Sequence, residues 1–384
     1  MTTALVIGGG LAGLLTSIQL ANQGIHTTLL EPSTPGGRAR SRQLKGQTFN
    51  LGPHALYCKG HLMKILEGLG LKLPGGDPLR LGSTLWMQGA AHPLPGSLPA
   101  LLTHPVLAGA RVKTLMKLAV RPKPMDVATW LSDLPALPRS FMLALLRLST
   151  YAPTPETLSA PAAFDQLQLA QGGVLYLHGG WQSLIDALLL KAQELGVILL
   201  QERALSVQPG VVQSDLATHR ADEVIVATSA PTAQRLMGRP LTQQAVTAAC
   251  LCLGFEQRPD GPSFCLDLQR PFYGSMHSDS AQLGTGAVLH LMHYGCGKRQ
   301  DLEHWADSVY PQWRQSNTQR WLPALQVSHG LLRHGIARPE SRLAPGLLLA
   351  GDYVGPAGML ADASAASAKA ACLAVLKAQF SSAA

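Results

Sequence analysis

The N-terminal segment alternates between short apolar runs and a glycine-rich stretch. An apolar run at 4–7 passes into the glycines of 8–13, and apolar residues then recur at helical spacing until Gly24. A second apolar run at 27–30 ends in Glu31. The pattern predicts a strand, a tight turn, a helix and a second parallel strand, which form a βαβ unit with an acidic residue at its tip.

The rest of the chain carries signals of both helix and strand. The stretch 98–150 is strongly apolar and helical in its periodicity, while 250–255 and 288–294 are short runs typical of strands. Near the C-terminus, the apolar run 346–352 ends in a Gly-Asp pair and is followed by an alanine-rich helical segment, 358–371. The sequence therefore predicts an α/β fold.

The composition is that of a folded chain, and its length suggests two domains. Of its 384 residues, 46% are hydrophobic and 14% charged, which excludes a disordered protein. The net charge of +8 favours an anionic partner, but the basic residues are dispersed and aromatic residues make up only 5%, so we expect no nucleic-acid partner. No run reaches the roughly 18 apolar residues of a membrane-spanning helix. A cytoplasmic location is expected, with peripheral membrane contact as an open possibility.

Cysteine and histidine spacing gives no sign of a metal site. The six cysteines are scattered without a CxxC pair, and we interpret them as reduced thiols, mostly in the core. His290 and His293 lie three positions apart, which on a strand places them on opposite faces. We therefore expect no bound metal.

The three glycines of the first turn have distinct physical roles. Gly8 permits the turn, Gly10 lets the backbone approach a pyrophosphate, and Gly13 lets the helix pack on the strand. The helix N-terminus offers oriented N–H groups to the anion, and Glu31 is placed to accept hydrogen bonds from a ribose. This combination predicts a dinucleotide-binding site.

The next segment separates FAD from NAD as the bound dinucleotide. Gly36 and Gly37 form a flexible diglycine, followed by Arg38 and Arg40. Such a loop can fold back over the same phosphates and add guanidinium donors to the helix N-terminus. We interpret it as a second contact with the phosphates of FAD rather than as a solvated basic loop.

These motifs resemble the superfamily of FAD-dependent amine oxidases, phytoene desaturases and protoporphyrinogen oxidases. Segment 8–41 is similar to the family's GxGxxG, acidic strand end and GGRxxS, and 50–54 to its Gly-Pro segment beside the flavin ring. Segments 179–188, 221–228 and 346–363 are similar to its later nucleotide-domain motifs. The resemblance, closest to the phytoene desaturase-like branch, implies a Rossmann-type, glutathione reductase-like FAD-binding domain with a discontinuous α+β substrate domain.

The resemblance also implies which residues hold the cofactor. The backbone of Ala204 would contact the adenine, Asp352 the ribityl or pyrophosphate region, and the backbone of Leu360 the edge of the flavin. The complete set of expected FAD-binding residues is Gly8, Gly10, Leu11, Ala12, Gly13, Glu31, Gly36, Gly37, Arg38, Arg40, Gly52, Pro53, His54, Ala204, Gly351, Asp352, Met359 and Leu360.

Three departures from the amine oxidase pattern point to the other branches. Ala361 and Asp362 replace the usual Glu-Gly, and Asp362 either caps a helix or lies near the flavin. The stretch 249–257 carries no counterpart of the lysine that amine oxidases place beside the flavin. Gly52 followed by Pro53 and His54 is more similar to desaturases and protoporphyrinogen oxidases.

The positions of the motifs divide the chain. We expect an FAD-binding domain from 1–75, 175–238 and 336–384, folded around one parallel sheet. The remaining stretches, 76–174 and 239–335, would form the substrate domain.

These motifs predict an FAD-dependent oxidoreductase that dehydrogenates, or desaturates, a mainly hydrophobic, isoprenoid- or carotenoid-like small molecule. Protoporphyrinogen oxidase-like and amine oxidase-like flavoenzymes, and a flavin or lipid carrier without turnover, are the alternatives. The catalytic residue is left open, with His54 as the one histidine carried forward. No second dinucleotide motif is evident, so oxygen or a quinone is the expected electron acceptor.

One segment raises the question of a membrane surface. Residues 98–107 are apolar and are followed by basic residues at 111–123. The segment fits either a helix lying on a bilayer or an ordinary helical cap on the substrate pocket, and the prolines within it favour the cap.

Overall fold

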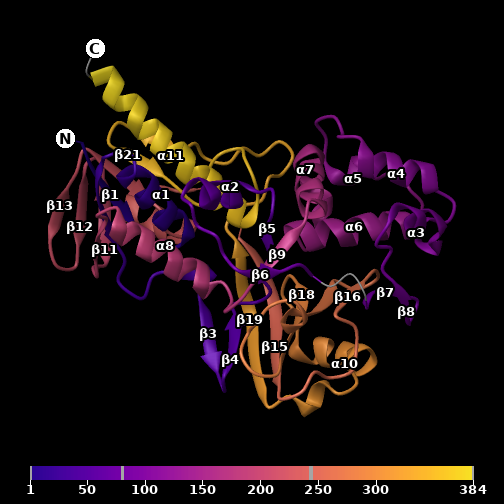
Figure 1. The fold of residues 1–384 in the computed structure, drawn as a ribbon. Coiled ribbons are helices and arrows are strands. Elements are labelled where there is room, and N and C mark those ends of the chain that lie inside the picture. The colour runs from indigo at the N-terminus through magenta and orange to yellow at the C-terminus, as the bar shows by residue number, and fades with distance from the viewer. Residues whose placement is uncertain (1, 79–81, 242–244, 383–384) are drawn as a thin grey trace.

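The computed structural model describes residues 2–78, 82–241 and 245–382, and it is built around two sheets (Figure 1). The first sheet has six strands, and its first five are parallel. In spatial order they are β10 (Ile198–Leu200), β2 (His26–Leu30), β1 (Thr3–Ile7), β14 (Glu223–Val226), β21 (Leu347–Leu349) and the antiparallel edge strand β20 (Arg342–Ala344).

The parallel sheet is the middle layer of three. Ala4 and Val6 of β1 pack into a core with the helices on one face, whereas Leu5 and Ile7 pack into a core on the other. This alternation follows from the two-residue period of a strand buried on both sides. The first face is covered by α1 (Leu11–Ala21), α2 (His61–Gly68), α8 (Gln182–Glu194) and α11 (Leu360–Ser382).

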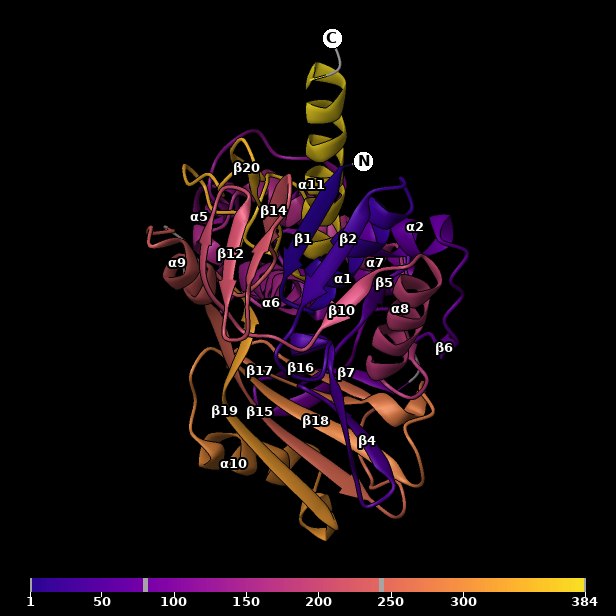
Figure 2. The same cartoon turned by 90° about the vertical axis from the view of Figure 1, so that its left-hand side faces the viewer.

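The opposite face carries a small antiparallel sheet and one short helix. The strands are β11 (Ala204–Gln208), β12 (Val211–Ser214) and β13 (Thr218–Arg220), and the helix is α9 (Ala230–Met237). Figure 2 shows β1, β2, β10 and β14 side by side behind this layer.

The second sheet has seven strands and lies below the first in Figure 2. It is antiparallel except for one parallel pair, β16 with β7. Its spatial order is β19 (Thr318–Ser328), β15 (Val246–Phe255), β18 (Ala287–Tyr294), β17 (Phe272–Met276), β16 (Phe264–Asp267), β7 (Ser83–Met87) and β8 (Ala90–Pro93). Helix α10 (Arg299–Val309) packs on one face through Leu302 and Trp305.

A helical group lies beside the second sheet, at the upper right of Figure 1. It comprises α3 (Leu98–Thr103), α4 (Arg111–Ala119), α5 (Val127–Trp130), α6 (Ala136–Thr150) and α7 (Ala160–Gln171). Three short strand pairings lie outside the two large sheets. They involve β3 (Ser41–Leu44) with β4 (Gln47–Asn50), and β9 (Val174–Leu177) with both β5 (Leu56–Tyr57) and β6 (Gly75–Gly76).

The predicted α/β class, with a Rossmann-type parallel sheet and a second α+β part, is confirmed. The helical character of 98–150 and the strands at 250–255 and 288–294 are confirmed as well. The C-terminal helix runs beyond the predicted 371, to Ser382. The domain limits stay a prediction. In the described part of the chain, no helix is both long and apolar enough to cross a membrane.

Candidate cofactor and substrate cavity

One large cavity, about 2020 Å³ in volume, joins the parallel sheet to the helical group. At its nucleotide end lie the residues that follow the carboxyl ends of β1, β2, β14 and β21, where ligands of such sheets bind. Most of the expected FAD-binding residues line this cavity; the exceptions are Gly13, Gly52 and Met359. The side chain of Met359 is 1% exposed and packs in a neighbouring core.

The glycine turn is built for close approach. Gly8 has a φ of +104°, and a Cβ on Gly13 would lie 1.8 Å from the Gly8 carbonyl oxygen, so the helix packs on the turn only with glycine there. A Cβ on Gly10 would meet no atom within 4 Å and would point into open space. Helix α1 has no side-chain cap and no acidic residue in its first turn. Its first N–H groups are therefore available to an anion.

Glu31 lines the cavity directly after the carboxyl end of β2, and hydrogen bonds fix its carboxylate. One carboxylate oxygen accepts a hydrogen bond from the N–H of Gly9 at 2.8 Å. The other accepts from the N–H and the hydroxyl of Ser33, at 3.0 and 2.7 Å. These bonds orient the carboxylate while leaving acceptor capacity for a ribose hydroxyl.

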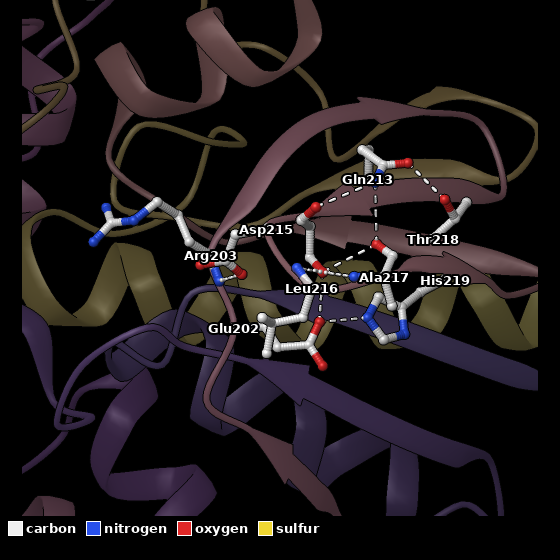
Figure 3. Close-up of polar contacts among 9 residues, drawn as sticks. Glu202, Arg203, Gln213, Asp215, Leu216, Ala217, Thr218 and His219 are labelled. Atoms are coloured by element: carbon white, nitrogen blue, oxygen red, sulfur yellow. Dashed lines mark hydrogen bonds and ion pairs between the residues drawn. The ribbon is translucent and has the colours of Figure 1, made fainter.

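A second fixed carboxylate, which the sequence did not indicate, lies nearby (Figure 3). Glu202 accepts a 2.5 Å hydrogen bond from the Ser214 hydroxyl and makes a 2.6 Å contact with Nε2 of His219. The Ser214 bond, and then the His219 bond, lower the pKa of Glu202. Glu202, Arg203 and Ala204 all line the cavity at the start of β11, so the small antiparallel sheet contributes to its wall.

The middle of the cavity is organised by an ion pair. Arg38 Nη1 donates to Asp352 Oδ2 at 2.9 Å and to the Val327 carbonyl at 2.8 Å, and the N–H of His329 donates to the same carboxylate oxygen. Burial favours the neutral acid, but the charge and hydrogen bond of Arg38 outweigh it, so the pKa of Asp352 is lowered. The other oxygen, Oδ1, is buried and has no hydrogen-bond partner.

Arg38 therefore differs from its expected role in one respect. We expected its guanidinium to be directed at phosphates, yet the structure places one of its nitrogens on Asp352. Arg38 nevertheless lines the cavity together with Gly8, Gly10 and Gly351. Arg40 bonds locally, to the carbonyls of Gly37 and Thr34.

His54 lies beside this ion pair and is neutral. Its Nδ1 lies 2.9 Å from the Gly52 carbonyl oxygen, and its ring centroid lies 4.9 Å from that of Trp181. Burial, together with the charges of neighbouring His290 and Arg38, lowers the pKa of His54 to about 4. The imidazole is therefore a weak base at neutral pH.

The distal part of the cavity is apolar with an aromatic floor. Tyr176 stacks on His277 with ring centroids 4.1 Å apart, and the hydroxyls of Tyr151 and Tyr273 are 2.7 Å apart. Burial strongly lowers the pKa of His277 and so keeps it neutral. The apolar wall is contributed by Leu94, Pro95, Leu98, Leu101, Leu115, Leu118, Ala119, Leu145, Leu148, Leu167, Ala170, Phe264 and Met292.

The two ends of the cavity differ in charge. The basic residues that line it are Arg38, Arg40, Arg203 and Arg235, and they come from the nucleotide-binding part of the fold. Among the described residues, the helical group and the seven-stranded sheet contribute no lysine or arginine to the lining. Asp77 also lines the cavity, so the distal part suits a largely apolar molecule that carries no anionic group.

The residues present fit FAD. The uncapped helix N-terminus and the open space at Gly10 suit a pyrophosphate, and the unpartnered, buried Oδ1 of Asp352 needs a donor that the protein does not supply. Glu31 and Ala204 border the position expected for the adenosine. The fold and the cavity thus define a dinucleotide-binding flavoprotein with an apolar substrate chamber.

Comparison with known proteins agrees with that class. The family model described as flavin containing amine oxidoreductase matches residues 11–376. The chain belongs to this family. Membership confirms the predicted superfamily and, at the level of the family, the flavin cofactor and the oxidoreductase class.

Individual relatives are distant. A phytoene desaturase from Cercospora nicotianae is 38% identical over 72 residues, a match that covers 18% of this chain and 12% of that enzyme. An oxidoreductase from Methanosarcina mazei has a TM-score of 0.78 at 17% identity and covers 98% of this chain and 100% of that one. Cyclohexylamine oxidase from Brevibacterium oxydans has a TM-score of 0.69 at 16% identity, with 98% and 99% coverage. These two structures share the fold.

Asp362 caps a helix, as one of the two interpretations of the sequence expected, but the helix is not its own. Its Oδ1 accepts a 2.8 Å hydrogen bond from the N–H of Leu62, so it caps helix α2 rather than its own helix. Gly60, the N-cap residue of α2, has no side chain with which to do so, and a Cβ there would lie 2.3 Å from the same oxygen. Asp362 thus caps a helix that begins 300 residues earlier in the sequence.

Proposed function

We propose that the protein is an FAD-dependent oxidoreductase that dehydrogenates a mainly hydrophobic, isoprenoid-like small molecule. The observation that carries the proposal is the apolar distal chamber, to which the described residues of the helical group and the seven-stranded sheet contribute no lysine or arginine. Such a chamber gains free energy by removing apolar surface from water, at about 25 cal/mol per Å². A substrate bearing several carboxylates, such as a porphyrinogen, finds no cation there.

The chain's own residues would orient the substrate and exclude water. When bound, the flavin supplies a two-electron acceptor for a C–H bond, and the substrate also loses a proton. His54 and His277 are both neutral and border the chamber. With the Nδ1 proton donated to the Gly52 carbonyl, Nε2 is the unprotonated nitrogen of the neutral His54 ring. Because the pKa of His54 is about 4, we expect a rate of flavin reduction that is flat from pH 6 to 9.

Anaerobic reduction of the bound flavin tests the proposal. The yellow protein would be mixed without oxygen with acyclic isoprenoid polyenes, porphyrinogens or primary amines in detergent, and its visible absorbance followed. We expect bleaching by the polyene class. Bleaching only by porphyrinogens or only by amines would replace the proposal with the protoporphyrinogen oxidase-like or amine oxidase-like alternative. A yellow protein that none of them bleaches would indicate a flavin or lipid carrier. Mixing the reduced protein with oxygen or a quinone then distinguishes the two expected acceptors.

A matched pair of variants tests the chamber itself. Leu148→Arg would place a charge in the apolar wall, whereas Leu190→Arg would do so on α8, where the side chain is 59% exposed. We expect Leu148→Arg to retain FAD and to lower the rate of bleaching at least about tenfold, since a buried charge is costly. Leu190→Arg should behave as the parent. Equal rates in both variants would contradict a substrate in this chamber.

We also propose that the outer face of α3 and α4 docks on an anionic bilayer. Val112, Met116 and Val120 are 75, 55 and 52% exposed, and Leu98 is 60% exposed. The exposed cations Arg111, Lys113 and Lys123 flank this face, which gives it the charge complementary to anionic lipid. The same segment lines the chamber through Leu98, Leu101, Leu115 and Leu118, so an apolar molecule could pass from lipid into it.

Vesicle flotation tests the docking face. The protein should float with vesicles of phosphatidylglycerol and phosphatidylcholine at low salt, and much less with phosphatidylcholine alone. Val112→Glu with Met116→Glu should abolish flotation, while Leu216→Glu, at a residue 75% exposed on the distant β12–β13 turn, should not. A parent protein that stays in solution with both kinds of vesicle would disprove docking without affecting the proposed chemistry.

A further inference from the structure

A compact group of metal-ligating side chains lies in the seven-stranded sheet. Cys250 and Cys252 occupy alternate positions of β15, and His290 lies directly across from Cys252 on β18. The two Sγ atoms are 3.6 Å apart, and the ligating atoms of all three residues lie within 4.8 Å of one another. All three side chains are fully buried.

The two ring nitrogens of His290 are buried, and neither makes a hydrogen bond to an oxygen or nitrogen atom. The Cys252 thiol, which is only a weak hydrogen-bonding group, lies beside the ring. Buried polar groups are nearly always paired, and a buried histidine that is offered no partner stronger than a thiol requires an explanation. A cation held between this imidazole and the two sulfurs would supply one.

We propose that Cys250, Cys252 and His290 bind one thiophilic d10 cation, Zn²⁺ or Cu⁺. Two sulfurs at the usual zinc–sulfur bond length of about 2.3 Å in tetrahedral geometry lie about 3.8 Å apart, close to the observed 3.6 Å. Thiolates and imidazole are the ligands that select these metals over Mg²⁺ or Ca²⁺. Three protein ligands suit three-coordinate Cu⁺, whereas Zn²⁺ would also need one water molecule enclosed with them.

The surrounding charges are compatible with a cation held by two thiolates. Arg320, across from Cys252 on β19, has a buried Nη1 without a hydrogen-bond partner. A guanidinium beside a metal-bound thiolate can donate a hydrogen bond to the sulfur and offset its negative charge.

The location indicates a supporting role for the metal. The three ligands point to the cavity side of the sheet, where Cys250 and Cys252 share a core with Tyr273 and Met292. His277, which lines the chamber, separates His290 from it, with ring centroids 4.8 Å apart. A bound metal would join β15 to β18 directly behind the chamber floor, so it would stabilise that floor without contacting substrate.

Metal analysis of the whole flavoprotein tests the site. Because the cluster is buried, the metal should be loaded during folding, by expression in medium supplemented with Zn²⁺ or with Cu²⁺, which cells reduce to Cu⁺. After gel filtration over a chelator, we expect about one equivalent of metal per chain. X-ray absorption at the metal edge, which flavin does not obscure, should show two sulfurs at about 2.3 Å and one nitrogen at about 2.0 Å. The two supplements distinguish zinc from copper.

Three variants complete the test. Cys252→Ser and His290→Gln should each reduce retained metal to below about a fifth of an equivalent, because a site of three ligands does not survive the loss of one. Cys265→Ser removes another buried cysteine, on the opposite face of the same sheet, and should retain the metal. Flavin content reports whether each variant has folded.

Three results would overturn the proposal. The parent protein could retain no metal from either medium, or the Cys252 and His290 variants could retain as much as the parent. Alternatively, an intact mass about 2 Da low, with a disulfide mapped to Cys250 and Cys252, would show that the sulfurs pair with each other. None of these results bears on the proposed reaction.

Discussion

The two ends of the cavity recognise their ligands by different means. At the nucleotide end, the recognition elements are a helix N-terminus, a turn that only glycine can form, and carboxylates whose orientation is fixed by hydrogen bonds. At the distal end, they are leucine and aromatic side chains from helices and strands that are far apart in the sequence. Polar recognition requires particular residues at particular positions, whereas an apolar wall requires only volume and shape.

The difference also appears in the ionisable groups. Asp352, between the two ends, stays charged because Arg38 compensates for its burial. Toward the chamber, His54 and His277 are kept neutral because burial is not compensated there. The boundary between charged and neutral groups therefore falls beside His54, where we expect the reactive end of the flavin.

The largest effect is expected at the glycine turn, where Gly13 is needed for helix packing and Gly10 for the approach of the ligand. Gly13→Ala places a Cβ 1.8 Å from a backbone oxygen, and we expect a loss of unfolding free energy of about 3 kcal/mol or more. Gly10→Ala meets no atom, so the flavin-free protein should keep its stability within about 1 kcal/mol. The methyl group would nevertheless occupy the path of the pyrophosphate and weaken FAD binding. Urea unfolding and FAD titration of both variants measure the two effects, and equal behaviour would refute the distinction.

Arg38→Ala tests the ion pair in the middle of the cavity. The variant loses a charge-assisted bond to Asp352, and we expect the Kd for FAD to rise about tenfold to a hundredfold, which corresponds to about 1.5–3 kcal/mol. Arg42→Ala, at an exposed position on β3, is the matched control and should retain FAD as the parent does. Unchanged flavin content in Arg38→Ala would show that the cofactor does not depend on this pair.

The neutral histidines predict how stability depends on pH. Burial lowers the pKa of His54 and of His329 to about 4, below their ordinary value of 6.5. Between these two pH values the unfolded chain binds protons that the folded chain does not. Stability should therefore fall as the pH is lowered from 6.5 to 4, by at most about 1.4 kcal/mol per pH unit for each histidine, and these two residues should contribute no pH dependence above 7.

Urea unfolding at pH 7, 6 and 5 measures this dependence. His329→Gln should reduce the slope, because glutamine does not titrate. A slope that is the same in parent and variant would mean that His329 is protonated in the folded protein.

The smallest effect is expected from substituting Asp362, which caps helix α2. Asp362→Ala should lower the unfolding free energy by about 1 kcal/mol through the loss of the bond to the N–H of Leu62. Asp362→Asn keeps an acceptor oxygen and should cost less. Neither variant should change the visible spectrum of the flavin, and a spectral shift would indicate that Asp362 acts on the ring rather than on helix α2.

The sequence by itself determined the nucleotide end of this protein. The glycines at 8–13, the acid at Glu31 and the Gly-Asp pair at 351–352 could be identified because each acts through backbone geometry or a single side chain. The order of apolar runs also predicted the α/β class, since strand and helix periods are local properties of a chain.

Only the tertiary structure decided the rest. Glu202 is held by Ser214 and His219 across a small sheet, and Asp362 caps a helix 300 residues away. The spacing of Cys250, Cys252 and His290 gave no sign of a shared site, because pairing between β15 and β18 is what joins them. The reason is physical: strand register and helix packing depend on side-chain surfaces distributed over the whole chain, and no local pattern records where those surfaces meet.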